Sequence, residues 1–132
     1  MVIDTSAIVA ILMDELESDI FSQILVGETT LAISAVTFHE ASIVIAGKKR
    51  HPSAAGLVDE FIRDLEIEVA AATIDHALAA REAYFRFGRG CHRAGLNLAD
   101  CFAYALAKSR GEPLLFKGDD FSRTDIAPAW RP

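Results

Sequence analysis

Cysteine and basic residues are scarce in this sequence, and each shortage argues against a class of protein. The 132 residues include two cysteines, Cys91 and Cys101, which do not form a Cys-X-X-Cys pair. We therefore expect a reduced, cytoplasmic protein and not a disulfide-stapled one. Lys and Arg number 13 against 19 Asp and Glu, which gives a net charge of −6. Because phosphate contacts need basic side chains, this balance argues against a generic nucleic-acid binder.

Long apolar runs are missing as well. The apolar stretches are too short, and too often broken by charge, to span a membrane. Asp4 interrupts the apolar start and no basic segment precedes it, so no signal peptide is expected. Hydrophobic residues still make up 52% of the chain, which is ample for a packed core. With no repeat or linker, the length predicts a single domain over residues 1–132.

Several ligand-binding motifs are also absent. The chain has no Walker loop and no Gly-X-Gly-X-X-Gly, so nucleotide binding of those kinds is not expected. The four histidines lack zinc-ligand spacing, and we interpret them as structural or surface residues. They are His39, His51, His76 and His92.

Short apolar strands alternate with helical segments along the chain. We expect strands at 1–3, 31–34, 67–70 and 113–116, and helices at 5–13, 14–26, 35–46, 52–65, 73–87 and 97–111. This alternation predicts an α/β fold in which right-handed crossovers build a mainly parallel sheet. Functional sites in such sheets form beyond the carboxyl ends of the strands.

Acidic residues follow two of these strands. Asp4 comes directly after the first, and Asp119 and Asp120 follow the strand that ends at Phe116. Asp4 suits a helix N-cap or a metal ligand, and the two roles are compatible. The Gly-Asp pair at 118–119 is typical of a turn, and alone it is a weak indication of function.

Glu40 lies on an apolar stripe of its predicted helix. Val36, Ile43 and Val44 stand four residues before it and three and four after it. A lone ionised carboxylate is costly to bury, so Glu40 should be paired or coordinated. The alternative is an acid at the edge of the stripe that reaches solvent or pairs with a core arginine.

Asp100 stands three residues after Asn97 at the start of a helix. If Asn97 is the N-cap, Asp100 would complete a capping box and favour the positive helix end. Residues 101–107 are apolar nearly all round, which predicts a buried helix. A carboxylate at the mouth of a buried helix also suits a metal site. Hard oxygen ligands of this kind are preferred by Mg²⁺, with Mn²⁺ as a substitute, and such ions promote displacement at phosphorus.

Four stretches taken together resemble the PIN-domain family. They are MVIDTSA at 1–7, Glu40, NLADCFAYA at 97–105 and LLFKGDDF at 114–121. The resemblance covers essentially the whole chain and is most specific from 97 to 126. Within the family, the sequence is most similar to VapC-like toxins of type II toxin–antitoxin modules. It implies a three-layer α/β/α fold with four or five strands and a Mg²⁺-dependent endoribonuclease. It also implies a homodimer and inhibition by a VapB-like antitoxin.

The resemblance also implies roles for individual residues. Asp4 and Asp100 match the metal-binding acids of the family, and Glu40 matches its inner acid. Many relatives place the fourth acid two residues before an Asp-Phe pair, where this chain has glycine, so we assign that role to Asp119 with Asp120 as the alternative. The remaining positions are supporting ones: Thr5 and Ser6 to orient Asp4 or a water, and Asn97 to steady Asp100.

Other readings and features remain open. An aspartate-based phosphatase would use Asp4 as nucleophile, but Ser6 stands where its second aspartate is usual. A non-catalytic binding module would keep the fold alone. The apolar face of the first helix, Ile8, Ile11 and Leu12, suits the core or a partner helix. A substrate track would draw on Lys48, Lys49, Arg50, Arg86, Arg89 and Arg93, each of which also suits a solvated surface.

Overall fold

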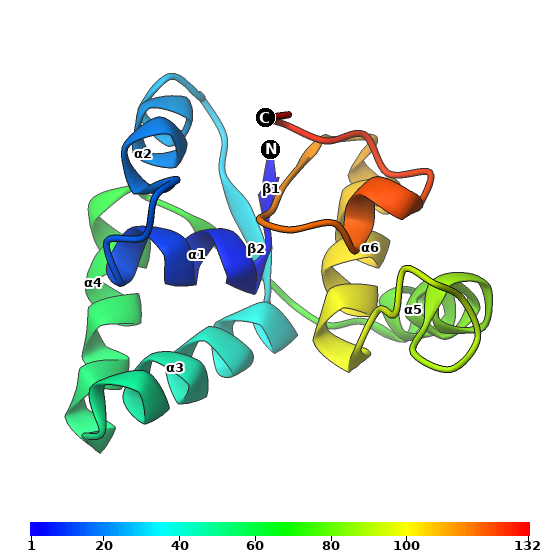
Figure 1. Ribbon diagram of the computed structural model, residues 1–132, viewed down its shortest axis with the longest axis horizontal. Coiled ribbons are helices and arrows are strands. Elements are labelled where there is room, and N and C mark those ends of the chain that lie inside the picture. The colour runs from blue at the N-terminus through cyan, green and yellow to red at the C-terminus, as the bar shows by residue number, and fades with distance from the viewer.

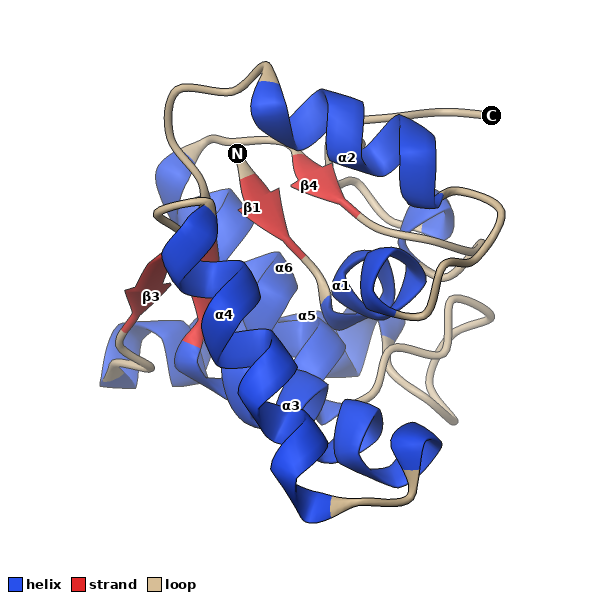
Figure 2. Cartoon of the chain, turned by 90° about the vertical axis from the view of Figure 1, so that its left-hand side faces the viewer, coloured by secondary structure: helices blue, strands red, loops and turns tan.

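Four short parallel strands form the centre of the molecule. The computed structural model describes all 132 residues. The strands are β1 (Val2–Ile3), β2 (Ala32–Ser34), β3 (Glu68–Ala70) and β4 (Leu114–Leu115), and their order in the sheet is β3-β2-β1-β4. Every pairing is parallel, so the carboxyl ends of all four strands meet at one edge. In Figure 2, β1 and β4 run side by side.

Helices cover both faces of this sheet. They are α1 (Thr5–Leu12), α2 (Ser18–Val26), α3 (Ala35–Lys49), α4 (Gly56–Asp64), α5 (Ile74–Phe87) and α6 (Leu98–Arg110), with short 3-10 helices η1 (Pro52–Ala55) and η2 (Phe121–Arg123). Helices α1 to α4 lie on one side of the strands, and α5 and α6 lie on the other (Figure 1). The predicted three-layer α/β/α fold with a parallel sheet is therefore confirmed. None of the helices combines the length and apolarity needed to cross a bilayer.

Side chains alternate between the two faces of the sheet, so the apolar core has two parts. Val2 and Leu114 point into the apolar cluster under α5 and α6, whereas Ile3 and Leu115 point into the cluster under α1 to α4. Successive strand residues face opposite sides of a sheet, so each strand supplies both layers. The residues of β1, β2 and β4 are buried on both faces, which explains their largely apolar sequence, whereas Glu68 and Val69 of the edge strand β3 are exposed.

Two predicted helix boundaries are wrong. The helix predicted over 14–26 begins only at Ser18, because Asp14 adopts a left-handed φ of 54° that interrupts a helix. The helix predicted to end near Gly47 continues to Lys49 and is closed by Arg50 at φ 57°. Gly47 is tolerated there, and the extension puts Lys48 and Lys49 in the last turn, where the helix dipole favours positive charge.

Candidate active site

Asp4 leaves β1 at the carboxyl edge and caps α1, as the sequence predicts. Its side chain is 2% exposed, and its Oδ2 accepts hydrogen bonds from the Ser6 backbone N–H (2.9 Å) and the Ser6 hydroxyl (2.6 Å). The Ser6 Oγ in turn accepts from the Lys117 backbone N–H at 2.9 Å, which ties the end of β4 to Asp4. The other oxygen of Asp4, Oδ1, is buried without a hydrogen-bond partner.

Glu40 approaches the start of α1 from α3. The Thr5 hydroxyl donates to Glu40 Oε2 at 2.6 Å, so this half-buried acid has a polar partner and not an arginine. The stripe around it is only partly buried, since Ile43 is 56% exposed. Glu40 therefore lies where the edge of the apolar stripe meets the loop that carries Asp4, and His39 beside it is exposed.

Asp100 lies in the first turn of α6, and the predicted capping box is present. Its backbone N–H donates to Asn97 Oδ1 at 2.9 Å, and its Oδ2 accepts from the Asn97 backbone N–H at 2.7 Å. These two bonds satisfy donors that a helix start would otherwise leave free. The helix behind Asp100 is buried from Cys101 to Ala107 except for Phe102, which fixes the position of the acid.

These acids interact electrostatically with one another. Burial raises the pKa of Asp4, and the nearby charge of Glu40 raises it further. Burial also raises the pKa of Asp100 to about 7, and the charges of Asp4, Glu40 and Asp120 add to the effect. None of the four has a basic side chain within 4.0 Å. The fold thus gathers negative charge without an internal cation, an arrangement that is costly unless a cation binds.

The loop after β4 presents its two acids differently. The Asp119 side chain is 81% exposed and pairs with Arg123 at 3.6 Å. Asp120 has no such partner, and its charge acts on Asp100. The geometry therefore favours Asp120, the alternative that the sequence left open, as the fourth acid. That role remains a prediction for both residues.

The donor set fits a hard divalent cation. Asp4, Glu40 and Asp100 each use one oxygen in the hydrogen bonds above and leave the other without a protein partner. No three His, Cys, Asp or Glu side chains converge closely enough to enclose an ion by themselves. Mg²⁺ commonly keeps several waters and binds through only one or two carboxylates plus substrate phosphate, so an open set of this kind suits it.

Two features of the site were missed by sequence reasoning. One is Lys117, whose Nζ lies 2.8 Å from Glu15 Oε2 and 2.6 Å from Glu17 Oε2, so that it fixes the turn between α1 and α2 against the end of β4. The other is Asp125, which joins the last loop to α5 and α6. Both contacts join segments far apart in the chain, and no local pattern indicates them.

The model of the PIN domain matches residues 1–127. The chain belongs to the PIN-domain family. This match agrees with the resemblance found in the sequence, and the matched residues include the acids at the carboxyl edge of the sheet.

Relatives with known names match over nearly the whole length. Ribonuclease VapC of Mycolicibacterium smegmatis is 45% identical over 127 residues, which cover 96% of this chain and 98% of the relative. Ribonuclease VapC30 of Mycobacterium tuberculosis is 44% identical over 127 residues, 96% of each chain. Ribonuclease VapC42 of the same species is 43% identical over 130 residues, 98% of each chain.

Solved structures share the fold at much lower identity. The crystal structure of Mycobacterium tuberculosis VapC20, described as a toxin that cleaves the sarcin-ricin loop, superposes with a TM-score of 0.80 at 17% identity and covers 99% of this chain and 98% of its own. A toxin–antitoxin complex from Klebsiella pneumoniae gives a TM-score of 0.69 at 17% identity, with the same coverage. At that identity the likeness concerns the fold alone.

Proposed function

We propose that this protein is a Mg²⁺-dependent endoribonuclease and the toxin of a type II toxin–antitoxin pair, with Mn²⁺ as a substitute ion. The observation that carries the proposal is the group of acids at the carboxyl edge of the sheet, which have no cationic partner within the chain. Relatives named ribonuclease VapC, at about 45% identity over nearly the full length, support the reaction type.

Asp4 and Asp100 would hold the ion, with Glu40 and Asp120 completing the pocket. When bound, Mg²⁺ lowers the pKa of a coordinated water and stabilises an in-line displacement at phosphorus. Ser6 and Asn97 orient the two ligands through the hydrogen bonds described above. Residues that hydrogen-bond to metal ligands in this way affect the affinity of a site for its ion. Burial raises the pKa values of Asp4 and Asp100, and a bound cation would lower both because it favours the ionised carboxylates.

The proposed site lies outside both cavities of the structure. Neither cavity of the structure is lined by Asp4, Glu40 or Asp100; the cavity of ≈ 330 Å³ lies between α5 and α6, and the cavity of ≈ 420 Å³ lies beside the C-terminal segment. Among the basic residues predicted to form a substrate track, Arg86 and Lys48 have acidic neighbours. The unpaired ones, which we propose for phosphate contacts, are Lys49, Arg50, Arg89 and Arg93.

Cleavage mapping on total RNA tests the reaction. Purified protein free of antitoxin should cut RNA at defined sites in Mg²⁺ or Mn²⁺ and should stop when EDTA is added. The matched control is Asp75→Asn, an exposed acid in the first turn of α5, which should cleave normally. Metal-independent cleavage, or none at any ion concentration, would contradict the proposal and favour a non-catalytic binding module.

Metal binding is measurable without RNA. An ion that binds only the folded site raises the free energy of unfolding, by about 2.7 kcal/mol at a hundredfold excess over its Kd. Differential scanning calorimetry should therefore show a higher Tm in millimolar Mn²⁺, and an Asp4/Asp100 double Asn variant should lose the shift. An unchanged wild-type Tm would argue against a resident ion.

An antitoxin partner is proposed on the face of α1 and α2. Ile8 is fully buried, so that position serves the core, whereas Ile11 and Leu12 are half-buried. Leu16 is 99% exposed and Val26 is 77% exposed, which leaves apolar side chains available to a partner helix. Affinity purification from the native locus should recover a small basic protein that blocks cleavage. Purification of the chain alone, with no effect of overexpression on growth, would contradict the toxin role.

A homodimer is proposed from a second apolar stripe. Ile74, Leu78 and Phe85 lie on one side of α5 and are 74%, 43% and 69% exposed, and Leu98 at the start of α6 is 68% exposed. Exposed apolar patches of this kind commonly mark interfaces. Light scattering should give twice the chain mass, and Phe85→Glu should give the monomer mass. A wild-type monomer at micromolar concentration would refute the dimer.

A further inference from the structure

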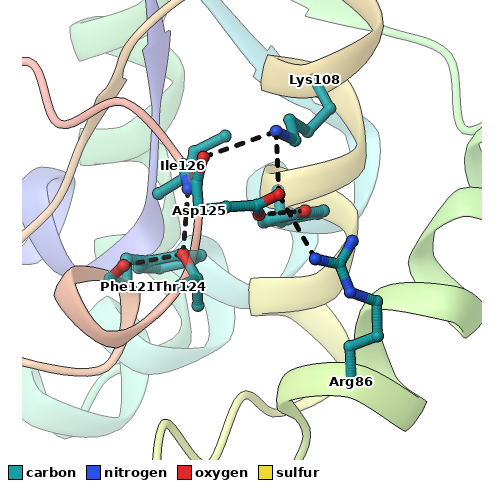
Figure 3. Close-up of polar contacts among 7 residues, drawn as sticks. Arg86, Lys108, Phe121, Thr124, Asp125 and Ile126 are labelled. Atoms are coloured by element: carbon teal, nitrogen blue, oxygen red, sulfur yellow. Dashed lines mark hydrogen bonds and ion pairs between the residues drawn. The ribbon is translucent and has the colours of Figure 1, made fainter.

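Four side chains form a network on the side of the molecule away from α1. The Tyr104 hydroxyl donates to Asp125 Oδ1 at 2.5 Å, and Lys108 Nζ lies 3.2 Å from Asp125 Oδ2. Arg86 Nη2 lies 3.4 Å from the same oxygen. Lys108 also donates to the Asp125 backbone carbonyl at 3.4 Å. Figure 3 shows the Asp125 carboxylate directed toward Lys108 of α6 and Arg86 of α5. We call these four residues the Asp125 clasp.

The clasp closes one end of the loop that bears the fourth acid. Residues 118–124 leave β4 after Lys117, which is fixed by its bonds to Ser6, Glu15 and Glu17. At the other end the Ile126 backbone N–H donates to Thr124 Oγ1 at 3.2 Å, directly beside Asp125. The loop is thus held at both ends by contacts with distant segments, while Asp119 and Asp120 between them are exposed.

Apolar packing makes the loop rigid between its two ends. Phe121 is 3% exposed and its ring lies 5.1 Å from that of Phe116, and Ile126 is 7% exposed in the same apolar cluster as Tyr104. Asp120 directly precedes Phe121 and begins η2. A shift of the clasp end of the loop would therefore move Phe121 and Asp120 together.

Neighbouring groups stabilise the negative charge of Asp125 at the centre of the clasp. Hydrogen bonding from Tyr104 and the nearby Lys108 hold the pKa of Asp125 below its usual range, so the group stays ionised. Tyr104 is 4% exposed, whereas the Asp125 side chain is 45% exposed, so the hydrogen bond joins a buried hydroxyl to a partly solvated carboxylate. Two helices, α5 through Arg86 and α6 through Tyr104 and Lys108, thus supply partners to this one carboxylate.

We propose that Asp125 is a positioning residue for the nuclease site: together with Tyr104, Lys108 and Arg86 it holds the loop 118–124 so that Asp120 lies beside Asp100. This inference rests on the proposed function, in which Asp120 is the fourth acid. Asp125 itself contacts neither the ion nor the substrate. Partners that orient metal-site acids typically change metal affinity or activity by about 10–100-fold when removed.

Tyr104→Phe is the sharpest test, because it deletes one hydroxyl and keeps the ring. In the full-length protein we expect an about tenfold higher Kd for Mn²⁺ by isothermal titration calorimetry. Backbone hydrogen exchange in residues 118–124 should also become faster. Asp125→Asn should show both effects more strongly. The matched control is Glu68→Gln, which breaks a bidentate ion pair with Arg110 (2.6 and 2.9 Å) far from the loop and should leave both quantities unchanged.

A double-mutant cycle separates positioning from general stability. If the clasp acts through Asp120, Tyr104→Phe should add nothing to the loss of Mn²⁺ affinity already caused by Asp120→Asn. Additive losses, or variants that bind Mn²⁺ as tightly as the wild type, would overturn the inference and leave the proposed function intact. A wild type that binds no Mn²⁺ would instead overturn the proposed function, and with it the metal-site role of the clasp. If Asp125→Asn does not fold, Tyr104→Phe alone decides.

Discussion

Two strand ends carry acids at the same edge of the sheet, and the chain fixes them in different ways. After β1, Asp4 is 2% exposed, caps α1 and bonds to Ser6 two residues away. After β4, Asp119 and Asp120 are exposed, and Asp120 begins η2 without a side-chain cap bond. One acid is fixed by its sequence neighbours, and the other depends on contacts with distant segments.

The difference has an energetic consequence. Asp4 keeps a buried oxygen without a partner, which destabilises the metal-free fold. The acids after β4 remain solvated and carry little such cost. The β1 end therefore supplies a buried acid whose charge a bound cation would compensate, whereas the β4 end supplies solvated acids on a loop that distant segments hold in place.

Asp4→Asn should have the largest effect. The substitution keeps the shape of the side chain and removes the charge, so cleavage should fall by about a hundredfold or more, as when a single preorganised electrostatic group is lost. The metal-free Tm should stay the same or rise, because a buried uncompensated charge is removed. A cleavage assay in Mg²⁺ with circular dichroism melting measures both. Full activity would sink the assignment of Asp4, and Asp100→Asn provides the parallel test for the second ligand.

The two acids after β4 should differ from each other. Asp120→Asn should reduce cleavage by about 10–100-fold, since its charge acts on Asp100. Asp119→Asn should change cleavage by less than about twofold, because that side chain is 81% exposed and its ion pair with Arg123 is a surface one. Parallel single-turnover assays decide, and the reverse order would restore Asp119 as the fourth acid.

Local rules account for what the sequence predicts well. Val2 and Ile3 followed by Asp4, and Asn97 followed three residues later by Asp100, are patterns whose physics lies within one turn of chain, and both caps are present. The apolar runs likewise predict all four strands and the parallel sheet. These features include the two acids that the family resemblance makes metal ligands.

Contacts between distant segments account for what the sequence does not predict. Asp119 pairs with Arg123, and the loop that carries Asp119 and Asp120 ends at the Asp125 clasp, whose partners come from α5 and α6. The C-terminal segment joins β4 through backbone bonds from Leu114 N–H to Ala127 and from Ala129 N–H to Leu114 (2.9 and 2.8 Å), which no periodic pattern announces. The predicted helix boundaries near Asp14 and Arg50 were wrong because both residues adopt a left-handed conformation that is uncommon for residues other than glycine.

Ser6→Ala should have an intermediate effect and act at the β1 end alone. It removes the hydroxyl that donates to Asp4 and accepts from Lys117, so we expect an about tenfold loss of Mn²⁺ affinity and of cleavage. Ser22→Ala on α2 is the matched control, since Ser22 is half-buried and makes no side-chain hydrogen bond. Equal behaviour of the two variants would show that Asp4 does not need Ser6.

The smallest expected effect is on the pH dependence of stability, which depends on acids from both strand ends. Asp100 has its pKa raised to about 7, first by burial and then by Asp4, with Asp120 a lesser cause. Its folded form thus binds a proton more tightly than the unfolded chain, where the pKa is roughly 3.9. The free energy of unfolding that Asp100 contributes is therefore greatest at acid pH and falls as pH rises through this interval. Denaturant melts of metal-free wild type and Asp100→Asn should diverge in that direction.

Carbon NMR titration of the Asp100 carboxyl in metal-free protein then sharpens the comparison. Removing a nearby negative charge eases ionisation, so both Asp4→Asn and Asp120→Asn should lower the pKa of Asp100. Asp4→Asn should lower it more, because Asp4 is the larger electrostatic cause. An equal or larger fall in Asp120→Asn would mean that the β4 loop holds its acid as close to Asp100 as the buried β1 end does, and the contrast between the two strand ends would fail.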